Sequence, residues 1–251
     1  MQAVSEGIRL DHVDKRFPGG VLALHDVDLQ VAPGEFVALV GPSGCGKSTI
    51  LRLVAGLDTP TVGRVEAPVV SNGRGASTAF VFQDPTLMPW ASVFDNVWLP
   101  LRLAGVARAQ AAGQVRELLA SMSLGDFERA FPAELSGGMR MRVSIARALV
   151  TRPRLLLMDE PFASLDEISR GRLNVDLLTW WAARSLAVVF VTHSVFESVF
   201  LSQRVLVMSE RPGHVVAEVS IAERYPRTMD FRATAAYQDA CREVSAALVA
   251  A

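Results

Sequence analysis

The sequence predicts an α/β fold in which a parallel sheet is packed between helices. A short apolar run at residues 35–40 leads into a glycine-rich loop and then into a segment, 48–57, whose apolar residues recur at helical spacing. Further apolar runs of strand length occur at 155–158, 188–192 and 205–208, with a helical pattern over 169–184 between the first two. Strands that alternate with helices are typical of a parallel sheet.

Additional elements are expected on either side of this core. Residues 8–13 and 24–31 alternate apolar with polar residues around the turn Pro18-Gly19-Gly20, which predicts an antiparallel sheet edge. Residues 63–75 are strand-like and turn-rich, and 79–83 are expected to form another buried strand. Between residues 93 and 149 the apolar residues follow helical periods, especially over 107–122 and 139–149, which predicts a helical insertion. Residues 223–251 are expected to form a helical cap.

The overall composition excludes several classes of protein. The 251 residues include 25 Lys+Arg and 26 Asp+Glu, half are apolar, and no long block of like charge occurs, so we expect neither disorder nor a nucleic-acid partner. No apolar run approaches the roughly 20 residues that span a bilayer, and no apolar stretch of signal-peptide length occurs near the start. Two cysteines far apart, Cys45 and Cys241, fit a reducing, cytoplasmic setting.

The glycine-rich loop matches the pattern G-x-x-x-x-G-K-[ST]. Its residues are Gly41, Pro42, Ser43, Gly44, Cys45, Gly46, Lys47, Ser48 and Thr49. Glycines let backbone N–H groups close around phosphate oxygens, Lys47 supplies a positive charge, and Ser48 is placed to ligate Mg²⁺. The alternative is a strand-to-helix turn that binds nothing. Cys45 is expected to be a small residue that fills the loop, the alternative being a reactive thiol.

Two acids, Asp159 and Glu160, end a buried strand. The carboxyl ends of parallel strands form the crevice in which α/β folds bind ligands, so Asp159 is expected to hold Mg²⁺ and Glu160 to polarise the attacking water. A merely solvated acid pair is the alternative.

Two further polar residues also end predicted strands. His193 is expected to contact the γ-phosphate, the alternative being a structural histidine. Gln83 could reach a metal or water, or could cap the turn that follows it. His12, His25 and His214 show no metal-ligand spacing and are expected on the surface, so no metal beyond Mg²⁺ is indicated.

A second anion-binding element is expected at Ser136-Gly137-Gly138, before the helical run 139–149. Ser136 can cap that helix while the glycines expose backbone N–H groups. An ordinary helix cap with a flexible lead-in is equally consistent with the pattern.

The ordered motifs resemble those of the ATPase subunits of ABC transporters, over almost the whole chain. They are GPSGCGKST, Gln83, LSGGM, LLLMDEP, Ser164-Leu165-Asp166 and His193. The resemblance implies a P-loop NTPase core with an N-terminal antiparallel β-subdomain and a helical signature subdomain. It further implies that ATP and Mg²⁺ are bound in a homodimer, with Ser136, Gly137 and Gly138 acting on the partner's ATP and Asp166 at the interface. Phe17 falls where the family stacks an aromatic ring on adenine, the alternative being a core residue.

The resemblance also predicts how the chain is divided. A single ABC ATPase domain is expected over 1–251, with its core and β-subdomain at 1–86 and 151–222, its helical subdomain at 87–150 and a tail at 223–251. Met139 and Met141 stand where the family often has glutamine, and Ser194 where it often has aspartate. These departures affect the expected fine geometry of the signature and any role for position 194.

The segment from Leu87 to Trp90, with Asn96-Val97 and the run 208–213, is similar to importer subunits of the nitrate, sulfonate and taurine type. That similarity implies a permease partner contacting the segment near Trp90, an indirect solute-binding protein, and a peripheral position on the cytoplasmic face of the inner membrane. A buried-core role for Trp90 is the alternative. Of Trp180 and Trp181, at least one is expected to be partly exposed. A soluble ATP-switched assembly factor is the alternative function, and a P-loop kinase would leave the signature unexplained.

Overall fold

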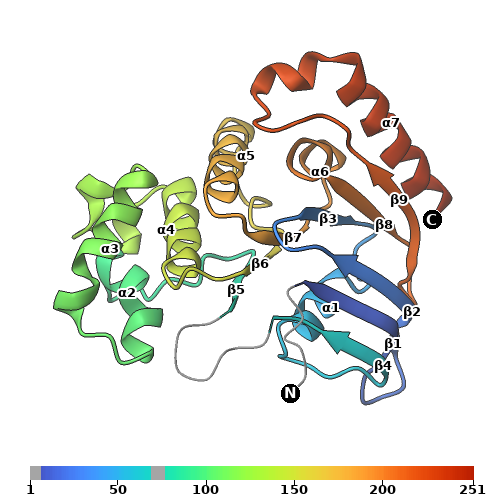
Figure 1. Cartoon of the computed structure of the whole chain (residues 1–251), viewed down its shortest axis with the longest axis horizontal. Coiled ribbons are helices and arrows are strands. Elements are labelled where there is room, and N and C mark those ends of the chain that lie inside the picture. The colour runs from blue at the N-terminus through green and yellow to red at the C-terminus, as the bar shows by residue number, and fades with distance from the viewer. Residues whose placement is uncertain (1–6, 69–76) are drawn as a thin grey trace.

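The computed structural model describes residues 7–68 and 77–251, which contain a six-stranded and a three-stranded sheet (Figure 1). The larger sheet has the order β5-β6-β7-β3-β8-β9. Its strands are β5 (Thr78–Val81), β6 (Leu155–Asp159), β7 (Ala187–Val191), β3 (Phe36–Val40), β8 (Arg204–Met208) and β9 (Val215–Ser220). All neighbouring pairs are parallel except β8 and β9. The predicted α/β fold with a parallel sheet is confirmed.

The smaller sheet is antiparallel, with the order β2-β1-β4. Its strands are β1 (Ile8–Arg16), β2 (Leu22–Val31) and β4 (Val62–Glu66). The strand-like pattern predicted over 63–75 yields a strand only as far as Glu66, and residues 69–76 lie outside the described part of the chain.

Helices cover both faces of the larger sheet, which explains why its central strands are apolar throughout. Phe36, Ala38 and Val40 of β3 pack into a core with the helices of one face. Val37 and Leu39 point to the other face, toward α1 (Lys47–Val54) and the antiparallel sheet. Since successive strand residues point to opposite faces, a strand covered on both sides requires apolar residues at every position.

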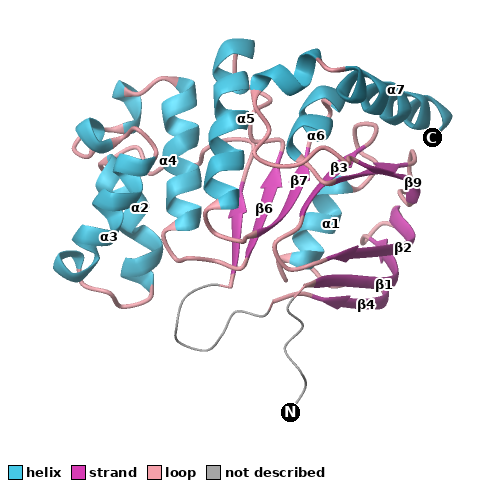
Figure 2. Ribbon diagram, turned by 45° about the horizontal axis from the view of Figure 1, so that its top comes forward, coloured by secondary structure: helices cyan, strands magenta, loops and turns pink. Residues whose placement is uncertain are grey.

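The helical insertion forms one end of the molecule (Figures 1 and 2). It contains α2 (Val93–Leu103), α3 (Arg108–Ser121), α4 (Gly137–Leu149) and the short 3₁₀ turns Gly125–Phe127 and Pro132–Glu134. Ser92 begins α2 by accepting a hydrogen bond from the Asp95 amide. This segment was predicted to be helical, and it is.

The remaining helices connect the core to the tail. They are α5 (Glu167–Ala182), α6 (Val195–Leu201), the 3₁₀ turn η3 (Met229–Ala233) and α7 (Ala235–Ala250). Sequence patterning missed α6, which is only seven residues long, and the edge strand β9. Among the described residues, none of the helices has both the length and the apolar character that crossing a bilayer requires.

Two expectations about burial were wrong. The strand predicted over 79–83 is not a buried one: it ends at Val81 and most of its residues are half-buried, because β5 is an edge strand paired only with β6. Trp180 and Trp181 are both buried, at 5% and 7% exposure. Both sides of α5 are covered: the Trp180 indole donates to the Ser121 carbonyl of the insertion, and Trp181 packs between Phe36 and Tyr225.

Candidate active site

The loop between β3 and α1 has a backbone path that only glycine fits at two positions. Gly44 and Gly46 have φ angles of +76° and +109°, and a Cβ at Gly46 would lie 2.5 Å from a Leu24 methyl carbon. Lys47 is only 6% exposed, and its ammonium donates to the carbonyls of Gly41 and Pro42, each at 2.8 Å. The lysine charge is therefore held within the loop, beside the first turn of α1.

Cys45 is buried within this loop at 1% exposure, and its sulfur lies 3.7 Å from the Lys47 nitrogen. Because a reactive thiol needs solvent access, this burial favours the role of a loop-filling residue. Cys241 is likewise buried, and both cysteines are free.

Ser48 and Asp159 bring the loop and β6 together. The Ser48 hydroxyl donates to Oδ1 of Asp159 at 3.0 Å. Burial raises the pKa of Asp159, while the hydrogen bond from Ser48 lowers it. A hydroxyl and a carboxylate oxygen are hard ligands of the kind that Mg²⁺ prefers, so this pair fits that ion.

Glu160 and His193 form a second pair at the same sheet edge. Nδ1 of His193 lies 3.1 Å from Oε2 of Glu160, within hydrogen-bond distance. Glu160 has a φ of +45°, unusual for a residue with a side chain, and its amide donates to the Val191 carbonyl at the end of β7. This strained position turns the Glu160 side chain toward the loop, where it lines a cavity.

The cavity has a volume of about 240 Å³ and is enclosed by the loop, the β1–β2 turn and two further segments. Its lining residues are Phe17, Val21, Ala23, Ser43, Gly44, Gly46, Lys47, Ser48, Thr49, Glu160 and Arg211. Phe17 is half-buried and faces this cavity, so its alternative role as a core residue is wrong.

Gln83 is exposed and does not line the cavity. It follows β5, the neighbour of β6, and so lies at the carboxyl edge of the same sheet. Among the described residues, no hydrogen bond joins Gln83 to Ser48 or Asp159, and its role as a metal ligand stays a prediction.

The Ser136-Gly137-Gly138 element lies elsewhere in the chain's own fold. Ser136 is exposed and caps α4 by accepting from the Met139 amide at 3.3 Å. A Cβ on Gly137 would lie 3.3 Å from Leu165, and one on Gly138 would lie 3.8 Å from Ser169. Asp166, also exposed, caps α5 by accepting from the Ser169 amide at 2.9 Å. The element therefore adjoins the Asp166 loop and does not line the cavity at the phosphate loop.

Sequence patterning missed Arg211 as a cavity residue. Its guanidinium donates to the Gly44 carbonyl through Nε at 3.2 Å and Nη2 at 2.9 Å. Backbone hydrogen bonds from Gly213 to Ala23 and from His25 to Gly213 attach this segment to β2. In the sequence, the run 208–213 stands out only by its resemblance to importers. No local pattern predicts that it contacts a loop more than 160 residues earlier.

The other histidines are exposed, as predicted. His12 nevertheless lies beside Asp26 and Asp28, with potential ligand atoms within 4.8 Å of one another. Its hydrogen bond to Asp26 raises the pKa of His12. The spacing of these residues along the chain does not indicate a metal site, because they come from two different strands, β1 and β2.

The family is decided by sequence comparison. The family profile described as "ABC transporter" matches residues 24–163, which include the phosphate loop, the signature and the acid pair. The chain belongs to the ABC transporter family. Within this ABC protein, the profile ends just after Glu160 and does not extend to His193.

Curated relatives of this ABC protein cover most of its length. It is 46% identical to the taurine import ATP-binding protein TauB of Burkholderia pseudomallei (strain 1710b), over 82% of this chain and 81% of the relative. It is 44% identical to the nitrate import ATP-binding protein NrtD of Synechocystis sp., over 81% of this chain and 77% of the relative.

Solved ABC cassettes share its fold. The dimeric structure of MJ0796, a bacterial ABC transporter cassette, matches with a TM-score of 0.74 and 30% identity, over 86% of this chain and all of the other. A post-hydrolysis state of the same cassette, bound to ADP and Pi, matches with a TM-score of 0.72 and 32% identity over the same shares of the two chains. The predicted ABC ATPase fold is thereby confirmed.

Proposed function

We propose that this ABC ATPase is the energy-supplying subunit of an importer, which binds and hydrolyses ATP between two copies of the chain. The observation that carries the proposal is the convergence of Lys47, Ser48 and Glu160 on one cavity that Phe17 also lines. These residues come from three separate segments and provide a phosphate-binding charge, a metal ligand, a base and a stacking surface.

Each residue is assigned a step according to its position. Lys47 and the loop amides hold the phosphates, and Phe17 stacks on adenine. Glu160 accepts a proton from the attacking water, and His193, 3.1 Å from Glu160, orients that water against the γ-phosphate. Ser48, Asp159 and Gln83 would hold Mg²⁺, which neutralises charge on the β- and γ-phosphates when bound.

The position of the signature supports a dimer. Ser136, Gly137 and Gly138 lie outside the cavity of their own chain, next to the Asp166 loop. The first N–H groups of α4, which have no acceptor within the helix, would suit an anion brought by a partner. The related MJ0796 cassette is described as dimeric, which favours a dimer here. We propose a head-to-tail pair in which each Ser136-Gly137-Gly138 element closes over the other's ATP.

The importer role is supported by relatives and by an exposed aromatic residue. Relatives at 44–46% identity are named for taurine and nitrate import, so we propose a small solute of the nitrate, sulfonate or taurine class. Trp90 is 77% exposed, which overturns its alternative core role and suits a permease contact at residues 87–90. We place the subunit on the cytoplasmic face of the membrane, with a solute-binding protein acting through the permease. No relative reported above is named as an assembly factor.

The test uses Glu160→Gln, which keeps the shape of the side chain and removes the base. With ATP and Mg²⁺, size-exclusion chromatography with light scattering should give twice the monomer mass, while steady-state ATP hydrolysis is nearly abolished. The matched control is Lys47→Ala/Glu160→Gln, which should remain monomeric because it lacks the phosphate-binding charge. Rapid hydrolysis by Glu160→Gln, or equal dimerisation of both variants, would reject these assignments.

A further inference from the structure

A polar cluster with a buried centre adjoins the turn that carries His193. We define it as Arg170, Thr192, Glu197 and Arg232, from α5, the end of β7, α6 and η3. Glu197 stands at its centre and is only 5% exposed. A buried carboxylate is costly unless it is paired, so its partners are informative.

One oxygen of Glu197 organises the turn that carries His193. The Thr192 hydroxyl donates to Oε2 of Glu197 at 2.6 Å, and the same hydroxyl accepts from the Ser194 amide at 3.0 Å. The Ser194 hydroxyl in turn accepts from the Glu197 amide at 3.3 Å. These bonds bracket His193 on both sides, so the backbone that aims its ring depends on the Glu197 carboxylate.

The other oxygen of Glu197 faces the loop that contains Asp166. Oε1 lies 3.7 Å from Nε of Arg170, and both atoms are buried without a hydrogen bond. Arg170 also donates from Nη2 to the Leu165 carbonyl at 3.0 Å, one residue before Asp166. An ion pair thus joins the His193 turn to the Asp166 loop, with room to shorten to a hydrogen bond.

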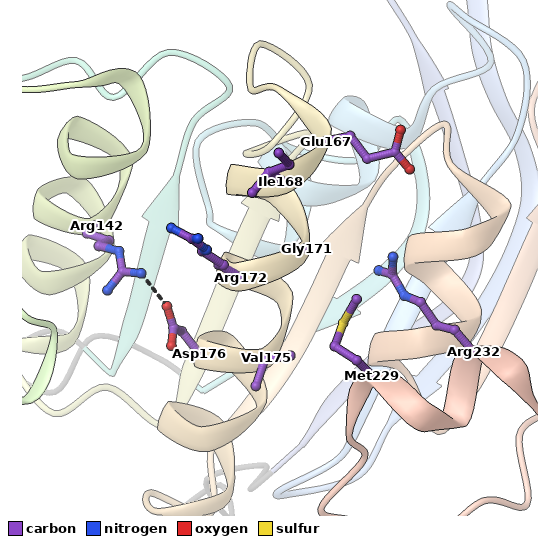
Figure 3. Close-up of a pocket in the computed structure, with 9 residues that line it drawn as sticks. All are labelled: Arg142, Glu167, Ile168, Gly171, Arg172, Val175, Asp176, Met229 and Arg232. Carbon is purple, nitrogen blue, oxygen red and sulfur yellow. Dashed lines mark hydrogen bonds and ion pairs between the residues drawn. The ribbon is translucent and has the colours of Figure 1, made fainter.

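The tail supplies a second positive charge. Figure 3 shows Met229 and Arg232 of η3 pointing toward α5, and the Arg232 guanidinium lies 4.8 Å from the Phe200 ring centre. Burial raises the pKa of Glu197, while the Thr192 hydrogen bond and the charges of Arg170 and Arg232 lower it. The tail therefore adds to the positive charge around the Glu197 carboxylate.

We propose that Glu197 is a positioning residue for ATP hydrolysis, which holds the His193 turn through Thr192 and links it to the Asp166 loop through Arg170. This inference rests on the proposed roles of His193 and Asp166. Through Arg170 and Glu197, the proposed dimer interface at Asp166 would be connected to the His193 turn by a route that does not pass through the nucleotide-binding cavity.

The decisive variant is Thr192→Val, which keeps the side-chain shape and removes the hydroxyl between Glu197 and Ser194. It should lower kcat by about 10- to 100-fold, because small displacements of a catalytic group have effects of that size, with KM for ATP changed less than about twofold. Thr192→Ser should restore most of the rate. The chain has four histidines, so their imidazole signals can be followed by ¹³C–¹H NMR. Thr192→Val should shift the His193 signal and leave the other three unchanged.

The link between Glu197 and the Asp166 loop is tested by Arg170→Met in the Glu160→Gln background. ATP-dependent dimerisation should weaken by about tenfold or more, because the substitution removes one partner of a buried ion pair. Ser198→Ala is the matched control for both Thr192→Val and Arg170→Met. Ser198 is buried beside Glu197 on α6, and within the described part of the chain its hydroxyl donates to the Val195 carbonyl of the same helix and not to the His193 turn. It should therefore leave kcat, the His193 signal and dimerisation unchanged.

Two results would overturn the inference. One is a Thr192→Val protein with wild-type kcat and an unshifted His193 signal, and the other is a Ser198→Ala protein as impaired as Thr192→Val. If His193→Ala is strongly impaired, either result rejects the positioning role of Glu197 and leaves the proposed role of His193 in place. If His193→Ala hydrolyses ATP like the wild type, the assigned role of His193 fails instead, and this inference falls with it.

Discussion

Nδ1 of His193 and Oε2 of Glu160 lie 3.1 Å apart, although 33 residues separate them in the chain. They meet because β6 and β7 are adjacent parallel strands and each residue follows the carboxyl end of its strand. The amide of Glu160 is itself tied to Val191 of β7. The sheet therefore positions both the proposed base, Glu160, and the proposed water-orienting group, His193.

Asp159→Asn should weaken the effect of Mg²⁺ more than the binding of ATP. Asp159, a proposed Mg²⁺ ligand, also accepts from the Ser48 hydroxyl, so its loss should lower metal affinity by at least the roughly 10- to 100-fold that loss of an outer partner typically causes. ATPase rates titrated with Mg²⁺ should show this shift. Asp176→Asn, another half-buried carboxylate paired with Arg142, is the control and should leave the titration unchanged. An equal effect of both changes would contradict the assignment.

Arg211→Ala should raise KM for ATP by about 10-fold or more with little change in kcat. The reason is that the guanidinium donates twice to Gly44 in the phosphate loop, and bonds from charged groups are worth about 1.5–3 kcal/mol. Steady-state kinetics measure both constants. Arg64→Ala serves as the control, because within residues 7–68 and 77–251 this exposed arginine pairs with Glu66 alone. An unchanged KM in Arg211→Ala would show that Arg211 does not contribute to ATP binding.

Trp90→Ala should reduce recovery of the subunit with its permease while leaving the subunit itself stable. At 77% exposure, removal of the indole should change the free energy of unfolding by no more than about 0.5 kcal/mol. Co-purification from membranes measures assembly. Leu103→Ala, at 80% exposure in the same helical insertion, is the control. Equal recovery of both variants with the permease would place the contact elsewhere.

Trp181→Ala should lower the free energy of unfolding by about 3–5 kcal/mol, as is usual for removing a buried tryptophan. Its ring packs edge-on to Phe36 at 5.8 Å and to Tyr225 at 4.6 Å between centroids. Trp181→Phe should cost much less, because it keeps an aromatic ring and removes an indole N–H that is buried without a partner. Chemical denaturation measures both, with Val249→Ala, at 90% exposure, as the neutral control. A Trp181→Phe protein as unstable as Trp181→Ala would contradict the packing argument.

Local patterns in the amino-acid sequence were enough to predict the alternation of strands and helices, the glycine-rich loop, and the placement of Asp159, Glu160 and His193 at strand ends. These features follow from local rules. A strand buried on both faces must be apolar, a loop around phosphate needs glycine, and parallel strands end at one edge.

Which distant segments meet could be seen only in the folded chain. The burial of both Trp180 and Trp181, the approach of Arg211 to Gly44, and the cluster around Glu197 each depend on elements far apart in the chain. Helical periodicity marks the apolar side of a helix only when its other side faces water, and α5 is covered on both sides. A buried charge such as Glu197 cannot be paired from sequence, because its partners are fixed by packing between elements and not by spacing along the chain.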